Sequence, residues 1–263
     1  MSKPISIVTV VFNDQIGLRK TLDSISNQTS EDYELVIIDG GSTDGTLDVV
    51  KEYGELVSCV TSEADDGIYD AMNKGLDQST GEWVIFMNAG DEFHSENTLS
   101  LALKEMNDPD TTYFGRAQIV ADSRNSWLYP SANISTSNID KWLRHKLPNH
   151  QAIFFPRSFY SKNRYDLKFI VSSDSDYKIR ALGGDYCYMD LTISNFYLGG
   201  VSSEYKFSNL YQQFKDRVMR KSGKGGVWYA LTGLISSIAK LIIYRIYGSQ
   251  APFVVEKLKR LIR

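Results

Sequence analysis

Four carboxylates lie where the predicted strands of this chain end. Asp39 closes one apolar run, Asp65 and Asp66 follow the next, and Asp91 follows a third. In an open, mostly parallel α/β sheet, ligands bind in the crevice at the carboxyl ends of the strands. Carboxylates gathered there repel one another unless a cation lies among them, and Mg²⁺ typically combines one or two carboxylates with substrate phosphate oxygens. The pattern therefore indicates a metal ion held against a polyphosphate ligand.

The elements that position these carboxylates alternate between strand and helix over the first hundred residues. β-Branched runs predict strands and apolar residues at helical spacing predict helices, with Asp14 as the N-cap of the first helix. Strands separated by short helices imply βαβ units and a parallel sheet. The expected strands are 5–12, 33–38, 57–61 and 83–87. Helices are expected at 15–27, 67–78 and 95–106, and a further helix follows the turn at 40–45 and ends at about residue 53.

The second half of the chain is less regular. Strands are expected at 111–120, 151–155 and 185–198, a loop at 131–138 and a helix at 174–182, followed by helices only after about 205. We therefore expect an α/β domain at 1–204, with a mostly parallel central sheet flanked by helices. Residues 1–105 and 106–204 would form its two halves, and 205–263 would form a helical carboxyl-terminal appendage.

Composition is that of a soluble globular protein. The chain has 263 residues, of which 42% are hydrophobic and 23% charged, enough for a sizeable core. Cys59 and Cys187 lie far apart in apolar stretches, which predicts buried free thiols and a reducing compartment. The apolar run at 5–12 is short and β-branched, so it predicts a strand rather than a signal peptide, and a cytoplasmic location is expected.

Charge is unevenly distributed along the chain. After residue 214 there are 11 basic and two acidic residues, a formal charge of +9, whereas the rest of the chain carries −12. A basic tail on an acidic body favours an anionic partner surface. The segment 227–247 has an apolar face and predicts a helix lying in the membrane interface or a helix packed on the domain; the same face could serve a homodimer. No nucleic-acid partner is expected.

Four segments, taken in order, resemble the motifs of the family 2 glycosyltransferases. They cover about the first hundred residues, with a weaker continuation through Arg180. The resemblance implies the GT-A fold, which binds nucleoside-diphosphate sugars. The segments are Ile5–Asn13 (ISIVTVVFN), Val36–Thr46 (VIIDGGSTDGT), Glu63–Gly75 (EADDGIYDAMNKG) and Gly81–Asp91 (GEWVIFMNAGD).

The resemblance assigns the wall of the nucleotide pocket to the end of the first strand, including Val11 and Asn13. Phe12, taken alone, could equally be a core residue. Asp39 would accept hydrogen bonds from the base or ribose of the donor, although a turn aspartate is an alternative. The next three residues are expected instead to cap the following helix: Ser42, Thr43 and Asp44.

The segment from residue 65 to 75 is placed by the resemblance beside the nucleotide and the donor sugar. Its carboxylate, hydroxyl, amide and ammonium groups could bind sugar hydroxyls and phosphate. Ile68 and Met72 are instead expected in the core, and Lys74 could be a solvated surface charge. The predicted donor-binding residues here are Asp65, Asp66, Tyr69, Asn73 and Lys74.

The segment Asn88–Asp91 stands where the family has its DxD-type acidic motif, but it departs from that pattern. Asn88 replaces the first aspartate and Gly90 another. Asp91 remains as the direct ligand of Mn²⁺ or Mg²⁺, and Asn88 and Ala89 are assigned to donor binding, with Asn88 as a contact of either the ribose or the metal. The metal would neutralise charge on the departing diphosphate.

Later segments resemble the acceptor side of the family. In the segment 172–180 (SSDSDYKIR) the resemblance makes Asp174 the catalytic base and Asp176 a support for the helix start. A helix-capping role is the alternative for Asp174, and it is compatible with a role as base. In the segment 149–152 (NHQA) it places His150 and Gln151 near the acceptor. A buried structural histidine is an equal alternative for His150.

The resemblance therefore implies an inverting transfer from a nucleoside-diphosphate sugar, with UDP-sugar favoured, to a saccharide hydroxyl. The basic tail favours a polyprenyl-diphosphate-linked acceptor in surface-polysaccharide or O-antigen assembly, and peripheral contact with the inner face of the cytoplasmic membrane. A sugar-nucleotide pyrophosphorylase is disfavoured, because residues 13–17 (NDQIG) lack a glycine- and arginine-rich phosphate loop. A non-catalytic scaffold subunit remains the alternative from another class of protein.

Overall fold

The computed structural model describes residues 3–198, 242–243 and 254. The chain divides into two units, one comprising 1–118, 128–166 and 174–196, the other 119–127, 167–173 and 197–263. All the predicted site residues belong to the first unit. The predicted appendage at 205–263 lies outside the described residues except for three positions, so the appendage and the boundary at 204 stay predictions.

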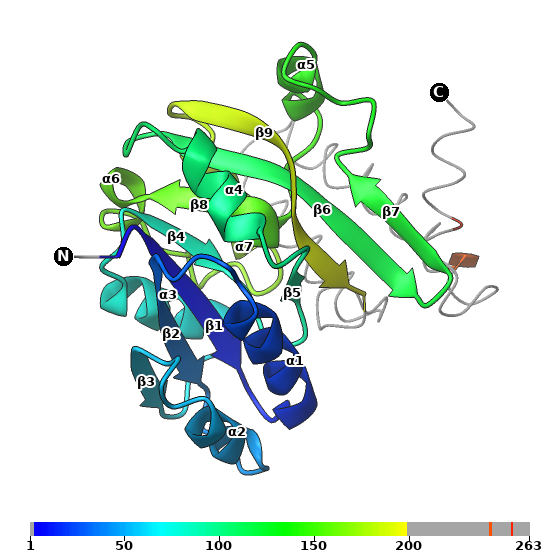
Figure 1. Ribbon diagram of the computed structural model, residues 1–263. Helices are drawn as coiled ribbons and strands as arrows, with labels where there is room; N and C mark the ends of the chain where they lie inside the picture. The colour runs from blue at the N-terminus through cyan, green and yellow to red at the C-terminus, as the bar shows by residue number, and fades with distance from the viewer. Residues whose placement is uncertain (1–2, 199–241, 244–253, 255–263) are drawn as a thin grey trace. The chain divides into compact units, whose positions relative to one another are not determined.

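The first half of the chain forms the predicted parallel βαβ arrangement (Figure 1). The strands lie side by side in the order β3-β2-β1-β4, each paired in parallel with its neighbour. Because the chain runs outward from β1 to β3 and then returns to β4, the strand order reverses between β1 and β4, where ligands bind in sheets of this kind. The elements are β1 (Ile5–Val11), α1 (Gln15–Ser26), β2 (Tyr33–Asp39), α2 (Thr46–Glu52), β3 (Cys59–Ser62), α3 (Ile68–Gln78) and β4 (Trp83–Phe86).

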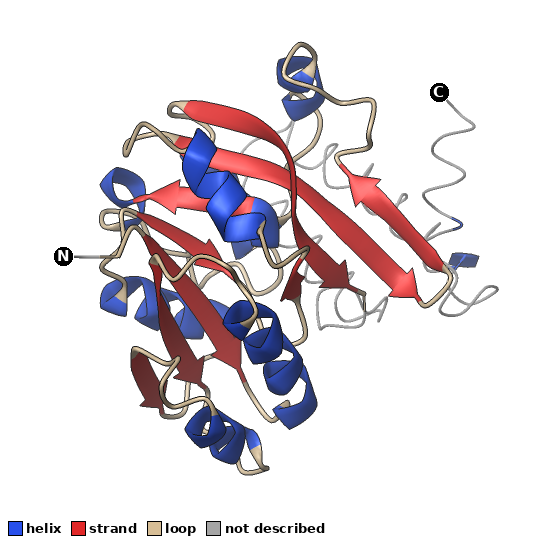
Figure 2. Cartoon of the chain, in the orientation of Figure 1, coloured by secondary structure: helices blue, strands red, loops and turns tan. Residues whose placement is uncertain are grey.

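The second half continues the sheet with antiparallel pairs: β4 with β8, β8 with β6, and β5 with β9 (Figure 2). The predicted strands and helix near 111, 151, 174 and 185 are confirmed. The shorter elements, β5, β7, α5 and α6, were not predicted, because each is too brief to show a period. The elements are β5 (Glu92–Phe93), α4 (Thr98–Glu105), β6 (Thr112–Asp122), β7 (Asn125–Tyr129), α5 (Ile139–Leu143), the 3₁₀ turn η1 (His150–Ala152), β8 (Ile153–Pro156), α6 (Arg157–Tyr160), α7 (Ser173–Ala181) and β9 (Tyr186–Tyr197).

Helix α3 packs closely on β1 at Gly75. A Cβ atom built there would lie 2.4 Å from Cγ1 of Val8, so only glycine allows this separation. The apolar face of α3, including Met72 and Leu76, joins the even-numbered valines of β1 in one buried cluster. The close packing fixes where the rest of α3 lies against the sheet.

Three expectations about burial were wrong. Ile68, expected in the core, has 47% of its surface exposed at the first turn of α3. Cys187 is exposed and Cys59 is only partly buried, although both thiols are free as expected. In β9 the buried residues come in adjacent pairs, such as Tyr188 and Met189, between more exposed ones, so an apolar stretch does not bury every residue. None of the helices in the described ranges is long and apolar enough to cross a membrane.

We expect Gly75→Ala to destabilise the protein by about 1–2 kcal/mol, since overpacking typically costs ~1–3 kcal/mol and the helix-propensity gain of alanine is at most ~1 kcal/mol. Chemical denaturation would measure it. The matched control is Gly184→Ala, whose Cβ would lie at an ordinary 3.7 Å from its nearest neighbour. Equal stabilities of the two variants would contradict the packing argument.

Candidate active site

Asp39 ends β2 with a fully buried carboxylate. Its Oδ2 accepts hydrogen bonds from the backbone N–H of Ser42 at 3.0 Å and from the hydroxyl of Ser62 at 2.6 Å. Its Oδ1 is buried and has no hydrogen-bond partner among the described residues. One oxygen thus holds the following turn, and the other is an acceptor that a ligand donor could satisfy.

The end of β1 presents an aromatic ring to solvent. Phe12 is 62% exposed, so it is not the core residue that it could have been on sequence grounds alone. Asn13 follows in the left-handed region at φ 49°, and its side-chain oxygen accepts from the backbone N–H of Thr43 at 2.8 Å. The backbone N–H of Asn13 in turn donates to the hydroxyl of Ser42 at 2.7 Å. These bonds tie the turn after β2 to the end of β1.

The prediction that three consecutive residues cap α2 holds only for Asp44. Its carboxylate accepts from the backbone N–H of Thr46 at 2.9 Å, in the first turn of the helix. Ser42 instead bonds to Asn13, and the backbone of Thr43 does the same. Two of the three residues in this turn therefore bond to the end of β1 rather than to α2.

Asp65 lies against the backbone of the turn after β2. Its Oδ1 accepts from the backbone N–H of Gly67 at 2.9 Å. A Cβ atom on Gly40 would lie 2.6 Å from Oδ2 of Asp65 and 3.3 Å from the ring of Phe12. The structure thus brings together the ends of β1 and β2 and the loop after β3, as the sequence predicted.

Lys74 joins the loop after β3 to α3. Its ammonium lies 2.8 Å from the carboxylate of Glu63 and 3.4 Å from that of Asp70, and it also donates to the carbonyl of Ala64. The backbone N–H of Asp66 donates to Asp70 as well. Lys74 is therefore a paired cation rather than a solvated one.

The other predicted residues of α3 face the interior. Tyr69 is buried, stacks on the ring of Tyr165 and directs its hydroxyl toward Asp174 at 3.4 Å. The side-chain amide of Asn73 pairs with the backbone of Tyr165, accepting from its N–H at 2.8 Å and donating to its carbonyl at 3.0 Å. Asn73 thus positions the segment that carries Tyr165.

Residues Asn88–Asp91 form a tight turn after β4. The backbone N–H of Asp91 donates to the carbonyl of Asn88, and Gly90 has a φ of 95°, a conformation that favours glycine. Ala89 bonds through its backbone N–H to Val10 of β1. The side-chain oxygen of Asn88 is buried and has no hydrogen-bond partner in the described part of the chain.

Thr21, which the sequence analysis did not single out, holds this turn from α1. Its hydroxyl donates to the carbonyl of Asp91 at 2.7 Å, lies 3.1 Å from that of Asn88, and accepts from the N–H of Gly90 at 3.0 Å. It is fully buried among the apolar residues of the helix. The sequence feature that could have identified Thr21 is a threonine on the apolar face of α1, one position before Leu22.

The oxygen atoms of this turn suit a hard divalent cation. Asp91 supplies a carboxylate and Asn88 an amide oxygen that lacks a partner, and Mg²⁺ and Mn²⁺ prefer such ligands. The described residues contain no group of three or more His, Cys, Asp or Glu side chains that could hold a metal by themselves. A metal at this turn would therefore take further ligands from phosphate and water.

Asp174 lies in the first turn of α7, at the position predicted for the base. Its Oδ2 is 2.9 Å from the ammonium of Lys178, one helical turn on. Burial by itself would raise the pKa of Asp174, but the Lys178 ammonium, the neighbouring His150 and the backbone N–H of Ser175 together hold that pKa below its usual value. The carboxylate is consequently ionised at neutral pH.

His150 is buried, with 5% of its surface exposed, and it contacts the rings of Phe86 and Phe155. Its Nε2 lies 2.6 Å from the hydroxyl of Tyr165. Burial, followed by the charge of Lys178, lowers the pKa of His150 to about 3. These contacts support the alternative of a structural histidine. Gln151 is equally buried beside it.

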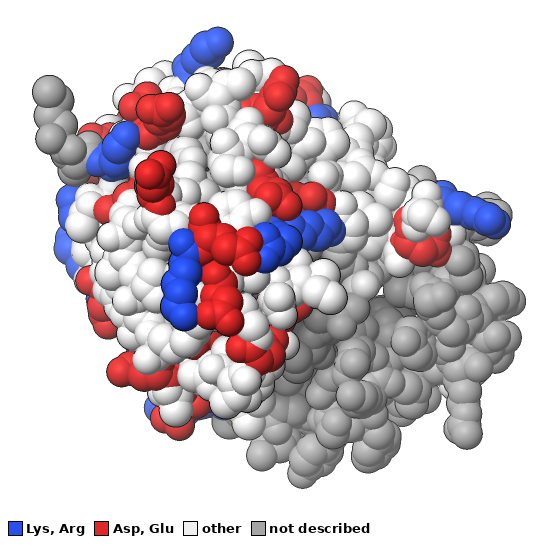
Figure 3. All heavy atoms as spheres, turned by 60° about the horizontal axis from the view of Figure 1, so that its bottom comes forward, with Lys and Arg blue, Asp and Glu red and all other residues white. Residues whose placement is uncertain are grey.

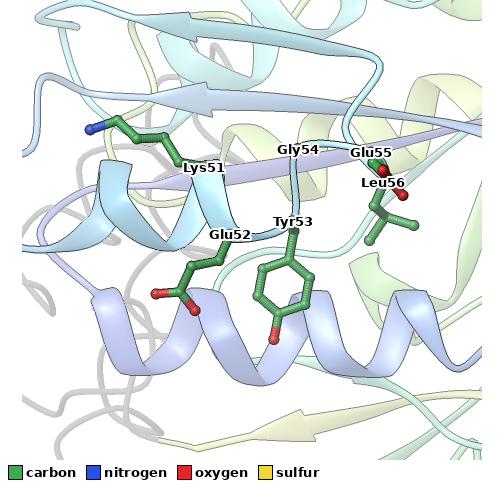
Figure 4. Close-up of a pocket in the computed structure, with 6 residues that line it drawn as sticks. All are labelled: Lys51, Glu52, Tyr53, Gly54, Glu55 and Leu56. Carbon is green, nitrogen blue, oxygen red and sulfur yellow. The ribbon is translucent and has the colours of Figure 1, made fainter.

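Two further views show one face of the molecule and one pocket. Figure 3 shows the side of the molecule toward which β1 and β2 run, where acidic side chains gather with lysines and arginines interspersed. Figure 4 shows a hollow of about 470 Å³ lined by residues 51–56, at the carboxyl end of α2. None of the predicted site residues lines this hollow, so it is not the candidate active site.

Solved structures with a similar arrangement define the fold as GT-A. The mannosyltransferase PcManGT from Pyrobaculum calidifontis, in complex with GDP-Man and Mn²⁺, has a TM-score of 0.62 at 19% identity, covering 98% of this chain and 80% of that one. S. aureus TarS 1–349, in complex with UDP-GlcNAc, has a TM-score of 0.65 at 15% identity, covering 94% and 73%.

The chain belongs to glycosyl transferase family 2, whose profile matches residues 6–165. A PGL/p-HBAD biosynthesis glycosyltransferase of Mycobacterium tuberculosis (strain ATCC 25177 / H37Ra) is 31% identical over 208 residues, which cover 75% of this chain and 78% of the relative. The GalNAc(5)-diNAcBac-PP-undecaprenol beta-1,3-glucosyltransferase of Campylobacter jejuni is 28% identical over 172 residues, covering 63% and 55%. The first of these relatives is thus named for PGL/p-HBAD biosynthesis and the second for an undecaprenol-linked substrate.

We expect the buried, neutral His150 to make stability depend on pH. The unfolded chain binds a proton near pH 6.5, whereas the native state does so only near pH 3, so stability is lost as pH falls through that window. The slope from this one group is at most ~1.4 kcal/mol per pH unit. Unfolding free energies of wild type and His150→Gln, measured from pH 7 to 4, should converge as pH falls.

The control is His145→Gln, because His145 is exposed. Its unfolding free energy should stay parallel to that of the wild type over the same range. A constant difference between wild type and His150→Gln would mean that His150 takes up its proton at the same pH in the native protein as in the unfolded chain.

The hydroxyl of Thr21 gives a second expectation. Thr21→Val keeps the shape but removes the hydrogen bonds to the Asn88–Asp91 turn, at a cost of ~1–3 kcal/mol. We expect a lower free energy of unfolding and weaker Mn²⁺ binding by calorimetry. Thr21→Ser keeps the hydroxyl and should retain most of both; if Thr21→Val binds Mn²⁺ as the wild type does, the hydroxyl does not shape that turn.

Proposed function

We propose that this protein is an inverting glycosyltransferase that moves a sugar from a nucleoside-diphosphate sugar, with a UDP-sugar favoured, to a hydroxyl of a lipid-linked saccharide. The observation that carries the donor assignment is the unpartnered, buried Oδ1 of Asp39, at the end of the strand beside β1, which leads into the exposed ring of Phe12. A nucleobase offers both a flat face for stacking and an N–H for a carboxylate. The adjacent Asp65 and the turn held by Asn13 complete the wall of this nucleotide pocket.

The diphosphate would lie at the Asn88–Asp91 turn. Asp91, with Asn88, would hold Mn²⁺ or Mg²⁺, which supplies positive charge to the departing diphosphate. On a face rich in acidic side chains, an anionic donor requires such charge (Figure 3). The complex of PcManGT with GDP-Man and Mn²⁺ supports the same combination of ligands.

Asp174 would act as the base. Its carboxylate takes the proton of the acceptor hydroxyl while that oxygen attacks the anomeric carbon. The bond from the anomeric carbon to the diphosphate oxygen breaks, and the nucleoside diphosphate leaves with the electron pair. A single displacement of this kind inverts the anomeric centre. The lowered pKa of Asp174 keeps it ionised and able to accept the proton.

A lipid-linked acceptor is supported by the Campylobacter relative, whose name specifies an undecaprenol-linked substrate. The +9 charge after residue 214 supports peripheral contact with an anionic membrane. Apart from three positions, that part of the chain lies outside the described residues. The membrane contact and a homodimer contact through this segment therefore stay predictions.

The test begins with a panel of UDP-, GDP- and dTDP-sugars, assayed for binding by calorimetry and for slow hydrolysis, with Mn²⁺, with Mg²⁺ and with chelator. We expect one donor to be bound and hydrolysed in a metal-dependent way. Asp174→Asn should bind that donor within about twofold of wild type and lose ~10²–10⁴ in turnover, the usual contribution of a general base.

Asp48→Asn is the control, because Asp48 is an exposed residue of α2 paired only with exposed Lys51 in the described contacts. It should match the wild type in both assays. Binding of no donor under any condition would overturn the proposal in favour of a scaffold, and undiminished turnover by Asp174→Asn would remove Asp174 as base.

A further inference from the structure

Lys178 is a buried lysine that the assignment of donor, metal and base leaves without a role. It lies one helical turn after Asp174 on α7, and its side chain is 8% exposed against 29% for that of Asp174. Lysine is almost never this buried unless it is paired. Its one ion pair recorded in the structure, at 2.9 Å, is with Oδ2 of Asp174.

The two oxygens of Asp174 are held unequally. Oδ2 is held by Lys178 at hydrogen-bonding distance. Oδ1 has longer contacts, 3.4 Å from the hydroxyl of Tyr69 and 3.4 Å from that of Ser175. A contact of 3.4 Å between hydroxyl and carboxylate is weak. Oδ1 is therefore the oxygen that can receive a proton from an acceptor.

The groups that face Asp174 from other elements are neutral at neutral pH. His150 of η1 has a pKa of about 3 because it is buried, and burial raises the pKa of Tyr165 well above its usual value. Tyr69 of α3 contributes a hydroxyl. At neutral pH the positive charge that opposes the burial of Asp174 thus comes first from Lys178 on its own helix, and His150 adds to the lowering of the Asp174 pKa only where it is itself protonated.

We propose that Lys178 is the positioning residue for the base: its ammonium fixes Oδ2, keeps the carboxylate ionised and presents Oδ1 to the acceptor hydroxyl. The inference rests on the proposed function only in taking Asp174 as the base. Burial raises the pKa of a carboxyl group, so without this ammonium a larger fraction of Asp174 would be protonated at a given pH. A protonated carboxyl group cannot take the acceptor's proton.

The test is a ¹³C-carboxyl NMR titration of the full-length protein, with the Asp174 resonance assigned by its loss in Asp174→Asn. We expect a midpoint below the ordinary aspartate value in the wild type. In Lys178→Gln, which keeps a hydrogen-bond donor without the charge, the midpoint should rise by at least about 1 unit. Lys178→Arg keeps the charge and should leave the midpoint low. Lys51→Gln removes an exposed lysine from the i,i+3 ion pair with Asp48 on α2 and should change nothing.

Donor hydrolysis gives the functional readout, using the UDP-, GDP- or dTDP-sugar that the wild type hydrolyses fastest. The acid limb of the rate profile of Lys178→Gln should move upward with the NMR midpoint, while donor binding stays unchanged. An Asp174 midpoint that does not move in Lys178→Gln overturns the inference and leaves the proposed function standing. A midpoint that moves while Asp174→Asn keeps full turnover overturns the base assignment instead.

Discussion

The contact between Gly75 and Val8 is the constraint on which the arrangement of the site depends. It sets the separation of α3 from β1, and side chains on the same helix inherit their positions from it. Tyr69 thereby reaches Asp174, and Asn73 reaches the backbone of Tyr165. Helix α3 thus connects two parts of the site: the strand ends that would bind the donor, and helix α7, which carries the proposed base.

A second property of the site is its unsatisfied polar atoms. Most buried polar groups in folded proteins have a hydrogen-bond partner. Asp39 and Asn88 each leave one buried oxygen without a partner among the described residues, and they lie at the carboxyl end of β2 and just after β4. Oδ2 of Asp39 and the backbone carbonyl of Asn88 are held by hydrogen bonds within their turns. The site therefore has fixed acceptors whose partners would arrive with the ligand.

Much of the fold could be predicted from the sequence, because long elements repeat their pattern. The parallel strands and their helices show clear periods, and Asp14 caps α1 by accepting from Gly17, as predicted. Phe12 could not be placed, since an aromatic residue at a strand end is compatible with both a core and a ligand surface. Lys178 was missed because i,i+4 charge spacing does not reveal which side of a polar helix becomes buried.

The sequence resemblance located the segments of the candidate site. The contacts of individual side chains within those segments came from the structure. Asn73 and Tyr69 were expected to meet the donor, yet the amide of Asn73 is engaged with Tyr165 and the hydroxyl of Tyr69 faces Asp174. Tyr165 could not be found in advance, because it stands alone in a loop and its importance comes from long-range stacking. Such contacts depend on tertiary structure that no local pattern encodes.

The two ion pairs along α7 bear on when Asp174 becomes ordered during folding. Asp174–Lys178 and Asp176–Arg180 both run acid before base at i,i+4, which favours a helix locally. A helix of nine residues is nevertheless marginal by itself in water, so α7 depends on docking of its buried Tyr177 against Tyr165. Ordering of the base therefore waits for closure of the aromatic core. On the proposed function, a chain still folding would hold no organised base and could not hydrolyse sugar nucleotides wastefully.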